Sequence, residues 1–142
     1  MALTLKQVRA AVAQQVDALT GFHQSKFPID YFGRTANQTA HLAFACSLES
    51  STALNERQRI TVGIMLQSAC KVVFSFRIRP HDLLTDYDNA LDKEVEVIKA
   101  CTSSYASILA GMQIRYERSN RRLTESNEYI IIEMEFTITH TI

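Results

Sequence analysis

Between Thr39 and Pro80, apolar residues occupy alternate positions in three successive runs of the chain. Small or polar residues stand between most of them, which is the period-two pattern of strands that bury one face. The apolar positions are Leu42, Phe44, Cys46 and Leu48, then Ile60, Val62, Ile64 and Leu66, then Val72, Phe74, Phe76 and Ile78. The pattern predicts strands over residues 39–49, 57–67 and 71–79.

The segments between these runs predict how the strands are joined. Ser50–Glu56 is polar, as expected for the tip of a hairpin. Ser68–Cys70 fits a tight turn or a bulge, but the even-numbered register continues through it, so one long bent strand is the alternative. Pro80 ends the third strand because proline has no amide proton to donate to a sheet.

Two segments have the spacing of amphipathic helices. Met1–Thr20 is predicted to be a helix that begins with a capping box between Thr4 and Gln7 and ends at Gly21. Leu83–Ala100 is predicted to be a second helix. Its apolar residues recur at intervals of three and four, which predicts a stripe buried against the sheet. This stripe comprises Leu84, Tyr87, Leu91, Val95 and Ile98.

The remaining segments predict two connections and a final hairpin. Phe22–Gln38 is expected to be irregular, with a short extended segment around residues 27–32, and Thr102–Ala110 to be a linker. Alternation from Met112 to Glu117 and from Tyr129 to Thr139 predicts two strands, separated by a polar loop over residues 119–127.

Together these elements predict an α+β fold in the order α-β-β-β-α-β-β. Each strand has one apolar face and each helix one apolar stripe. The simplest way to bury them is a mainly antiparallel sheet of about five strands with both helices on one face. The length of 142 residues fits a single domain spanning 1–142. The other sheet face is mixed in composition and is expected to meet water or a polar partner.

Composition narrows the classes of function. Fifteen basic and fifteen acidic residues give a net charge of zero, which weighs against a dedicated nucleic-acid binder. No signal peptide or apolar run of membrane-spanning length is visible, so we expect a soluble protein made in a cytoplasm, with no membrane partner. The three cysteines include no CxxC pair, and they are expected to be small buried hydrophobes in a reducing compartment.

The sequence shows no catalytic or metal-binding constellation. The four histidines, His23, His41, His81 and His140, do not stand at ligand spacing from one another or from cysteine. The aspartates from Asp82 to Asp92 lack the glycine and closing glutamate of a calcium loop. No phosphate-binding glycine loop or GxSxG motif is present. We therefore expect no cofactor and no enzyme, although a pocket using His41 or His81 would support the competing enzyme hypothesis.

Arginines gather in two groups. One group is Arg115, Arg118, Arg121 and Arg122 in the last hairpin, and the other is Arg57, Arg59, Arg77 and Arg79 along two predicted strands. Such groups can contact phosphate or an acidic protein surface. They can equally be solvated strand faces with glutamate neighbours, or partners for carboxylates in a subunit interface.

The segment VVFSFRIRPHD at residues 72–82, followed by DYDNALD at 86–92, resembles the middle of tail terminator proteins of long-tailed bacteriophages. The preceding hairpin, the closing strand Tyr129–Thr139, the chain length and the element order are also similar to that family. The resemblance extends from Leu3 to Thr139. Related neck and tail-completion proteins of similar size share these features.

The resemblance implies a structural virion protein that assembles into a ring, typically a hexamer. Such a ring caps the tail tube, ends its polymerisation and joins the tail to the head-side connector, and genomic DNA passes through it. The expected location is the virion tail or neck, after assembly in the bacterial host cytoplasm. We predict that the subunit or partner interface includes Arg57, Arg59, Arg77, Arg79, Asp86 and Asp88. The competing class is a small adaptor that binds a protein through a free sheet edge.

Overall fold

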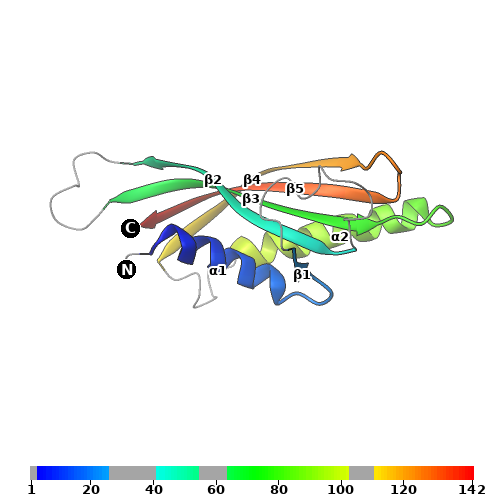
Figure 1. Cartoon of the computed structure of the whole chain (residues 1–142), viewed down its shortest axis with the longest axis horizontal. Coiled ribbons are helices and arrows are strands. Elements are labelled where there is room, and N and C mark those ends of the chain that lie inside the picture. Colours follow the sequence, from blue (N-terminus) through cyan, green and yellow to red (C-terminus); the bar gives the residue numbers. More distant parts are fainter. Residues whose placement is uncertain (1–2, 26–40, 55–63, 103–110) are drawn as a thin grey trace.

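The computed structural model describes residues 3–25, 41–54, 64–102 and 111–142. The elements are α1 (Leu5–Asp17), β1 (His23–Gln24), β2 (Ala43–Ala53), β3 (Met65–Arg77), α2 (Leu83–Thr102), β4 (Met112–Leu123) and β5 (Tyr129–Thr141). The strands form one sheet in the order β1-β2-β3-β5-β4. Both helices lie on the same side of this elongated sheet (Figure 1). The predicted α+β class and element order are confirmed.

The sheet is mixed, because β1 pairs in parallel with β2 whereas the other pairs are antiparallel. The sequence did not predict β1, which is only two polar residues long and is held by Ala43 and Phe44 of β2. The extended segment expected around residues 27–32 and the linker at 103–110 lie outside the described residues.

The alternating stretch before Pro80 forms one continuous strand through residues 68–70, where a turn was one of the two expectations. Residues 68–70 lie inside β3, which pairs with β5 without interruption from Met65↔Thr141 to Arg77↔Tyr129. The alternative of one long strand is therefore correct over 65–77. No glycine or proline interrupts this run, and β5 offers a partner of the same length. The predicted strand residues 57–63 lie outside the described part of the chain.

Two bulges lengthen the outer strands beyond their predicted ends. The register of β2 against β3 shifts between Leu48 and Ser50, and β2 then continues to Ala53 through part of the predicted hairpin tip. The register of β4 against β5 shifts between Tyr116 and Arg118. The loop expected over 119–127 was wrong at its start, because β4 runs on to Leu123, and it is confirmed over 124–127. A bulge exchanges the two faces of a strand, so odd-numbered residues of β4 beyond it face the helices.

The core lies between the helices and the sheet. Helix α1 begins as predicted: the Thr4 hydroxyl accepts from the Gln7 amide at 3.2 Å, and the Gln7 side chain accepts from the Thr4 amide at 2.9 Å. Its buried residues pack on the sheet and include Val8, Val12 and Val16. The start and end of the described chain lie together, since the Leu3 amide donates to the Thr141 carbonyl at 2.7 Å.

The sheet face opposite the helices is not uniformly polar. Ala43, Ala45, Val73 and Ile131 form a second, small buried cluster there. The expectation that this face meets only water or a polar partner is therefore corrected at that end of the sheet. Farther along, the face carries charged residues.

Candidate functional site

Helix α2 buries a different face from the one its sequence predicts. The residues it buries share one side of the helix and are Asp86, Ala90, Glu94, Val97 and Cys101. They recur at intervals of four, four, three and four, so they form a continuous stripe against the sheet. Two of the five are carboxylates, which seldom enter a protein interior without partners.

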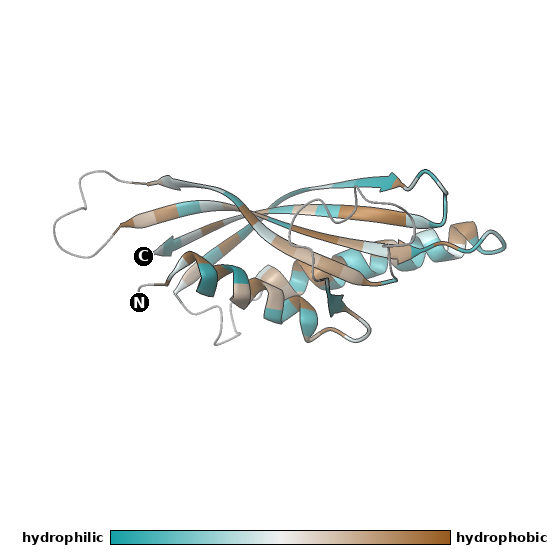
Figure 2. Cartoon of the chain, in the orientation of Figure 1, coloured by the Kyte–Doolittle hydropathy of each residue, from teal (hydrophilic) through white to brown (hydrophobic). Residues whose placement is uncertain are grey.

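The apolar stripe that was expected to be buried is instead turned outward. Leu84 is 73% exposed, Val95 47% and Tyr87 38%, while Leu91 and Ile98 are partly exposed. The prediction was wrong for Leu84, Tyr87 and Val95, because hydropathy alone assigns both carboxylates to the solvent. Ile98, in contrast, packs against the core as predicted. We call the row Leu84, Tyr87, Leu91 and Val95 the α2 stripe. Brown colour marks the apolar first turn of α2 at the right-hand end of Figure 2.

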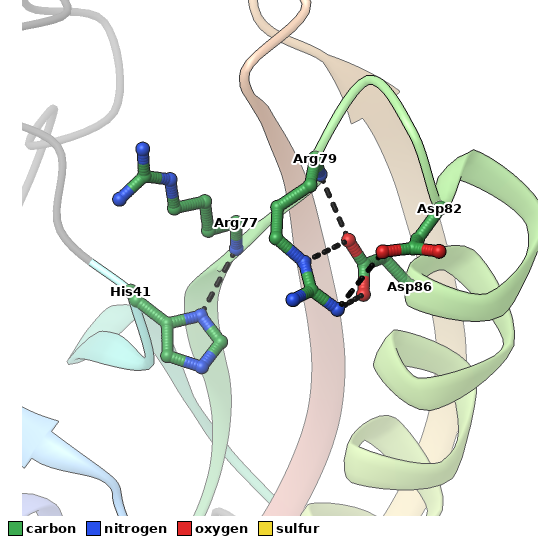
Figure 3. A network of polar contacts seen from close by, with 5 residues as sticks. All are labelled: His41, Arg77, Arg79, Asp82 and Asp86. Atoms are coloured by element: carbon green, nitrogen blue, oxygen red, sulfur yellow. Dashed lines mark hydrogen bonds and ion pairs between the residues drawn. The ribbon is translucent and has the colours of Figure 1, made fainter.

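Arg79, two residues beyond the end of β3, explains how Asp86 is buried. The Arg79 guanidinium donates to both carboxylate oxygens of Asp86, at 3.2 and 3.1 Å, and the Arg79 amide donates to Oδ2 at 2.8 Å (Figure 3). These bonds from Arg79 hold the pKa of Asp86 below its usual value. The exposed Asp82 lies 3.5 Å from the same guanidinium. This network fixes the start of α2 against the sheet.

His41 extends this network on the β2 side. Its Nδ1 accepts a hydrogen bond from the Arg77 amide at 3.0 Å, and its ring packs edge-on against Phe76. Nδ1 must be unprotonated to accept this bond. Partial burial and the neighbouring Arg77 charge both lower the pKa of His41. The histidine therefore serves as a neutral acceptor here.

A second arginine accounts for the burial of Glu94. Arg121 donates to both carboxylate oxygens of Glu94, at 2.8 and 2.6 Å. The bulge in β4 places Arg121 on the helix side of the sheet, since odd-numbered residues face that side beyond Tyr116. Hydrogen bonding to Glu94 in turn raises the pKa of Arg121. The two ion pairs, together with the buried Ala90, Val97 and Cys101, hold α2 in the rotation that exposes the α2 stripe.

The first turn of α2 also forms an open apolar hollow. Leu83, Leu84 and Tyr87 meet Ile78 and Leu123 around a volume of about 560 Å³. Leu83 and Leu123 are each more than half exposed. Because Leu123 ends β4 and Asn127 lies in the turn that follows, the hollow lies at the end of the sheet where β4 turns into β5. The α2 stripe and this hollow form one apolar surface, which is our candidate for assembly.

The predicted interface residues occupy several places. Arg79 and Asp86 pair with each other within the chain, and Asp86 is buried. Arg77 and Asp88 are exposed. Arg57 and Arg59 lie outside the described residues. The sequence did not identify the α2 stripe as an outward surface, and the signal was the presence of Ala90, Val97 and Cys101 on the same helix side as the two carboxylates.

The arginine group in the last hairpin has carboxylate partners. Arg115 pairs with Glu117 at 2.7 Å, Arg118 with Glu135, Arg121 with Glu94, and Arg122 with Glu133 at 3.9 Å. On the outer face Lys71 also lies 3.0 Å from Glu49 and 3.8 Å from Glu133. This favours the interpretation as strand faces with glutamate neighbours over a phosphate-binding patch.

The buried histidine and the three cysteines, which are reactive residue types, lie in structural positions. His140 is buried and its Nε2 lies 2.9 Å from the Ser68 hydroxyl, while burial lowers its pKa. The three cysteines are buried as expected, and burial raises the pKa of Cys101 to about 12. Across the described ranges, no three histidine, cysteine or acidic side chains are arranged to hold a metal ion.

None of the helices in the described ranges is long and apolar enough to span a membrane. No protein-family model matches the chain, and no curated protein does. Among solved structures, the chain is similar to a protein in the virion of a native gene transfer agent particle, with a TM-score of 0.51 and 16% identity over 95% of both chains. At this identity the likeness shows that the two chains share a fold.

Proposed function

We propose that this chain is a structural virion protein of a phage-like particle, in its tail or neck. In this role six copies form a ring, the number typical of the tail terminator family. The ring caps the tail tube and ends tube polymerisation. The ring joins the tube to the head-side connector. The fold shared with a gene transfer agent virion protein and the resemblance at residues 72–92 support this proposal.

The single observation that carries the proposal is the outward apolar surface of α2. Leu83, Leu84 and Leu123 are more than half exposed and lie around one hollow. A contiguous exposed apolar surface is typical of a site that a protein partner covers. Soluble proteins that work as monomers rarely expose large contiguous apolar surfaces, so this surface favours a role within an assembly.

The open sheet face is compatible with a ring through which DNA passes without being bound. On the described part of the open sheet face, Lys71, Arg118 and Arg122 are matched by three glutamates, Glu49, Glu135 and Glu133, so these ion pairs leave no excess of positive charge. DNA could pass such a face without being held, because tight nucleic-acid binding requires unneutralised cations. The proposed role needs no cofactor and no catalysis, and it places the chain in the virion after assembly in the host cytoplasm.

Two measurements test this role. Light scattering and negative-stain images of the same chromatographic peak should give the mass of a closed ring and show a central hole. Adding the chain to polymerising tail tube protein should then shorten the tubes and label their ends. Tubes that grow to the same length with no bound chain at their ends would contradict the proposed capping role.

The open edge of the sheet supports a second candidate, a small adaptor. Among the described strands, β4 is the last of the sheet and pairs only with β5 along its twelve residues. A partner can add a strand to such an edge and gain main-chain hydrogen bonds. An adaptor would form a one-to-one complex with its partner and remain without a ring, which the same light-scattering measurement distinguishes.

A further inference from the structure

The two helices leave different surfaces at the two edges of the sheet. α2 packs against β4 and β5, whereas α1 packs against β2 and β1 at the other edge. The α2 stripe therefore lies on the β4 side. Any second surface beside α1 and β2 lies across the molecule from it, as the arrangement of the helices in Figure 1 indicates.

The surface around the α2 stripe is acidic. Asp88 and Asp92 are exposed on the turns beside the stripe, whereas Asp82, which precedes the helix, lies 3.5 Å from the Arg79 guanidinium. Lys93 and Glu96 pair with each other at 3.1 Å and contribute no net charge. A partner for this surface should combine apolar contact with positive charge.

The opposite edge carries a groove of that kind. It has a volume of about 570 Å³ between the start of α1 and the middle of β2. Leu5 and Leu48 supply apolar walls, and Lys6 and Arg9 supply positive charge. The one carboxylate in the lining, Glu49, lies 3.0 Å from Lys71 and is neutralised by it. We call this the α1–β2 groove.

We propose that the α2 stripe of one copy packs into the α1–β2 groove of a second copy. The two surfaces differ from each other, both are partly apolar, and their charges are opposite. A contact between two different surfaces of the same chain repeats from copy to copy, and it closes into a ring when the rotation allows. This inference rests on the proposed ring and names the surfaces that build it.

The alternative contact, between the α2 stripes of two copies, accounts for fewer of these observations than the contact between stripe and groove. It would bring the acidic surroundings of the two stripes together, and it would leave the basic α1–β2 groove without a partner. A contact between unlike surfaces covers both, and it lets Asp88 of one copy approach Lys6 or Arg9 of the next.

Two variants that each damage one surface test the contact. Leu84→Asp places a charge in the stripe, and Leu5→Asp places one in the groove. Both positions are exposed, at 73% and 43%, so both variants should fold. Each alone should lose self-association by roughly tenfold or more, the loss expected on removing an apolar anchor. Their equimolar mixture should form a one-to-one dimer, because one intact stripe then meets one intact groove.

Two results would overturn the inference. One is self-association of Leu5→Asp at the level of the unaltered chain, and the other is a mixture that stays monomeric while the unaltered chain assembles. If the unaltered chain assembles only on tail tubes, a photo-cross-linking residue at position 84 should link to residues 5–9 or 47–51 of another copy there. Links to another α2, or no links between copies, would also overturn it.

The outcome separates this inference from the proposed function. Rings that cap tubes but cross-link through other residues would refute the contact and leave the capping role standing. A stripe-to-groove contact in a chain that does not bind tube ends would refute the capping role and leave the contact standing.

Discussion

The two helices of this protein pack on the same sheet in opposite ways. α1 buries valines, with Val8, Val12 and Val16 each at most 1% exposed, and its outer side is mostly polar. α2 buries Asp86 and Glu94 beside the smaller apolar residues Ala90, Val97 and Cys101, and it leaves Leu84 exposed. The burial of apolar area therefore holds α1 in place, whereas two arginine–carboxylate pairs contribute to the placement of α2.

This difference indicates which apolar helix face is buried within one chain and which is left for a partner to cover. A helix that buries its apolar side gains the full hydrophobic contribution within one chain. Ion pairs inside a protein contribute less, because desolvation offsets much of their attraction. α2 thus forgoes burial of the α2 stripe within the chain, and that burial becomes available on assembly.

The largest contrast should come from placing one carboxylate on each helix. Val12→Asp puts a charge into the core and should lower the free energy of unfolding by about 4 kcal/mol or more. Leu84→Asp should change it by no more than about 0.5 kcal/mol, because the site is exposed and an acidic residue near a helix start is favourable. Urea denaturation of both variants measures the two effects. Similar losses in both would contradict the contrast between the helices.

The sequence predicted helix α1 correctly but predicted the wrong buried face for α2, because the two helices depend on signals at different distances along the chain. The capping box and the valine spacing of α1 are local signals, and both were confirmed. The rotation of α2 depends on Arg79 and Arg121, which lie seven residues before Asp86 and twenty-seven after Glu94. Arg121 reaches the helix side only because of the bulge in β4, and no turn residue in the sequence marks that bulge.

The sheet shows the same division between local and distant information. The alternation from Tyr129 to Thr139 predicted nearly all of β5, because one face of that strand is buried along its length. The end of β4 was missed because its polar residues are satisfied across the sheet by charged partners, such as Glu133 for Arg122. The two-residue β1 has no pattern of its own to detect.

Removing the charge from Glu94 should have the second-largest effect. Glu94→Gln keeps the shape of the buried side chain but weakens both bonds from Arg121, and it should lower the free energy of unfolding by about 2 kcal/mol. Glu96→Gln is the matched control, since it removes a half-exposed pair with Lys93 on the same helix and should cost no more than about 0.5 kcal/mol. Equal shifts of the urea midpoint would show that the buried pair does not hold α2.

A smaller effect should come from the start of α1. Thr4→Ala removes the hydroxyl of the capping box and should lower the free energy of unfolding by about 1 kcal/mol. Thr85→Ala, in the exposed first turn of α2, is the control and should change it by no more than about 0.5 kcal/mol. Thermal unfolding of both variants measures the difference. An equal or larger loss at Thr85 would contradict the assignment of the Thr4 effect to its capping box.

The smallest effect should come from acid, which should weaken α2 before α1. The pKa of Asp86 is lowered by its bonds to Arg79, so its contribution is complete above the ordinary value of about 4. As the pH falls below that value toward the pKa of the folded state, the contribution is progressively lost. Hydrogen exchange, corrected for intrinsic rates, should therefore show lower protection in α2 than at pH 7, with little change in α1. Asp86→Asn should already be less protected at pH 7 and should show a smaller further change in acid. Equal loss in both helices would mean that α2 is held in the same way as α1, and that its outward stripe is not a consequence of these ion pairs.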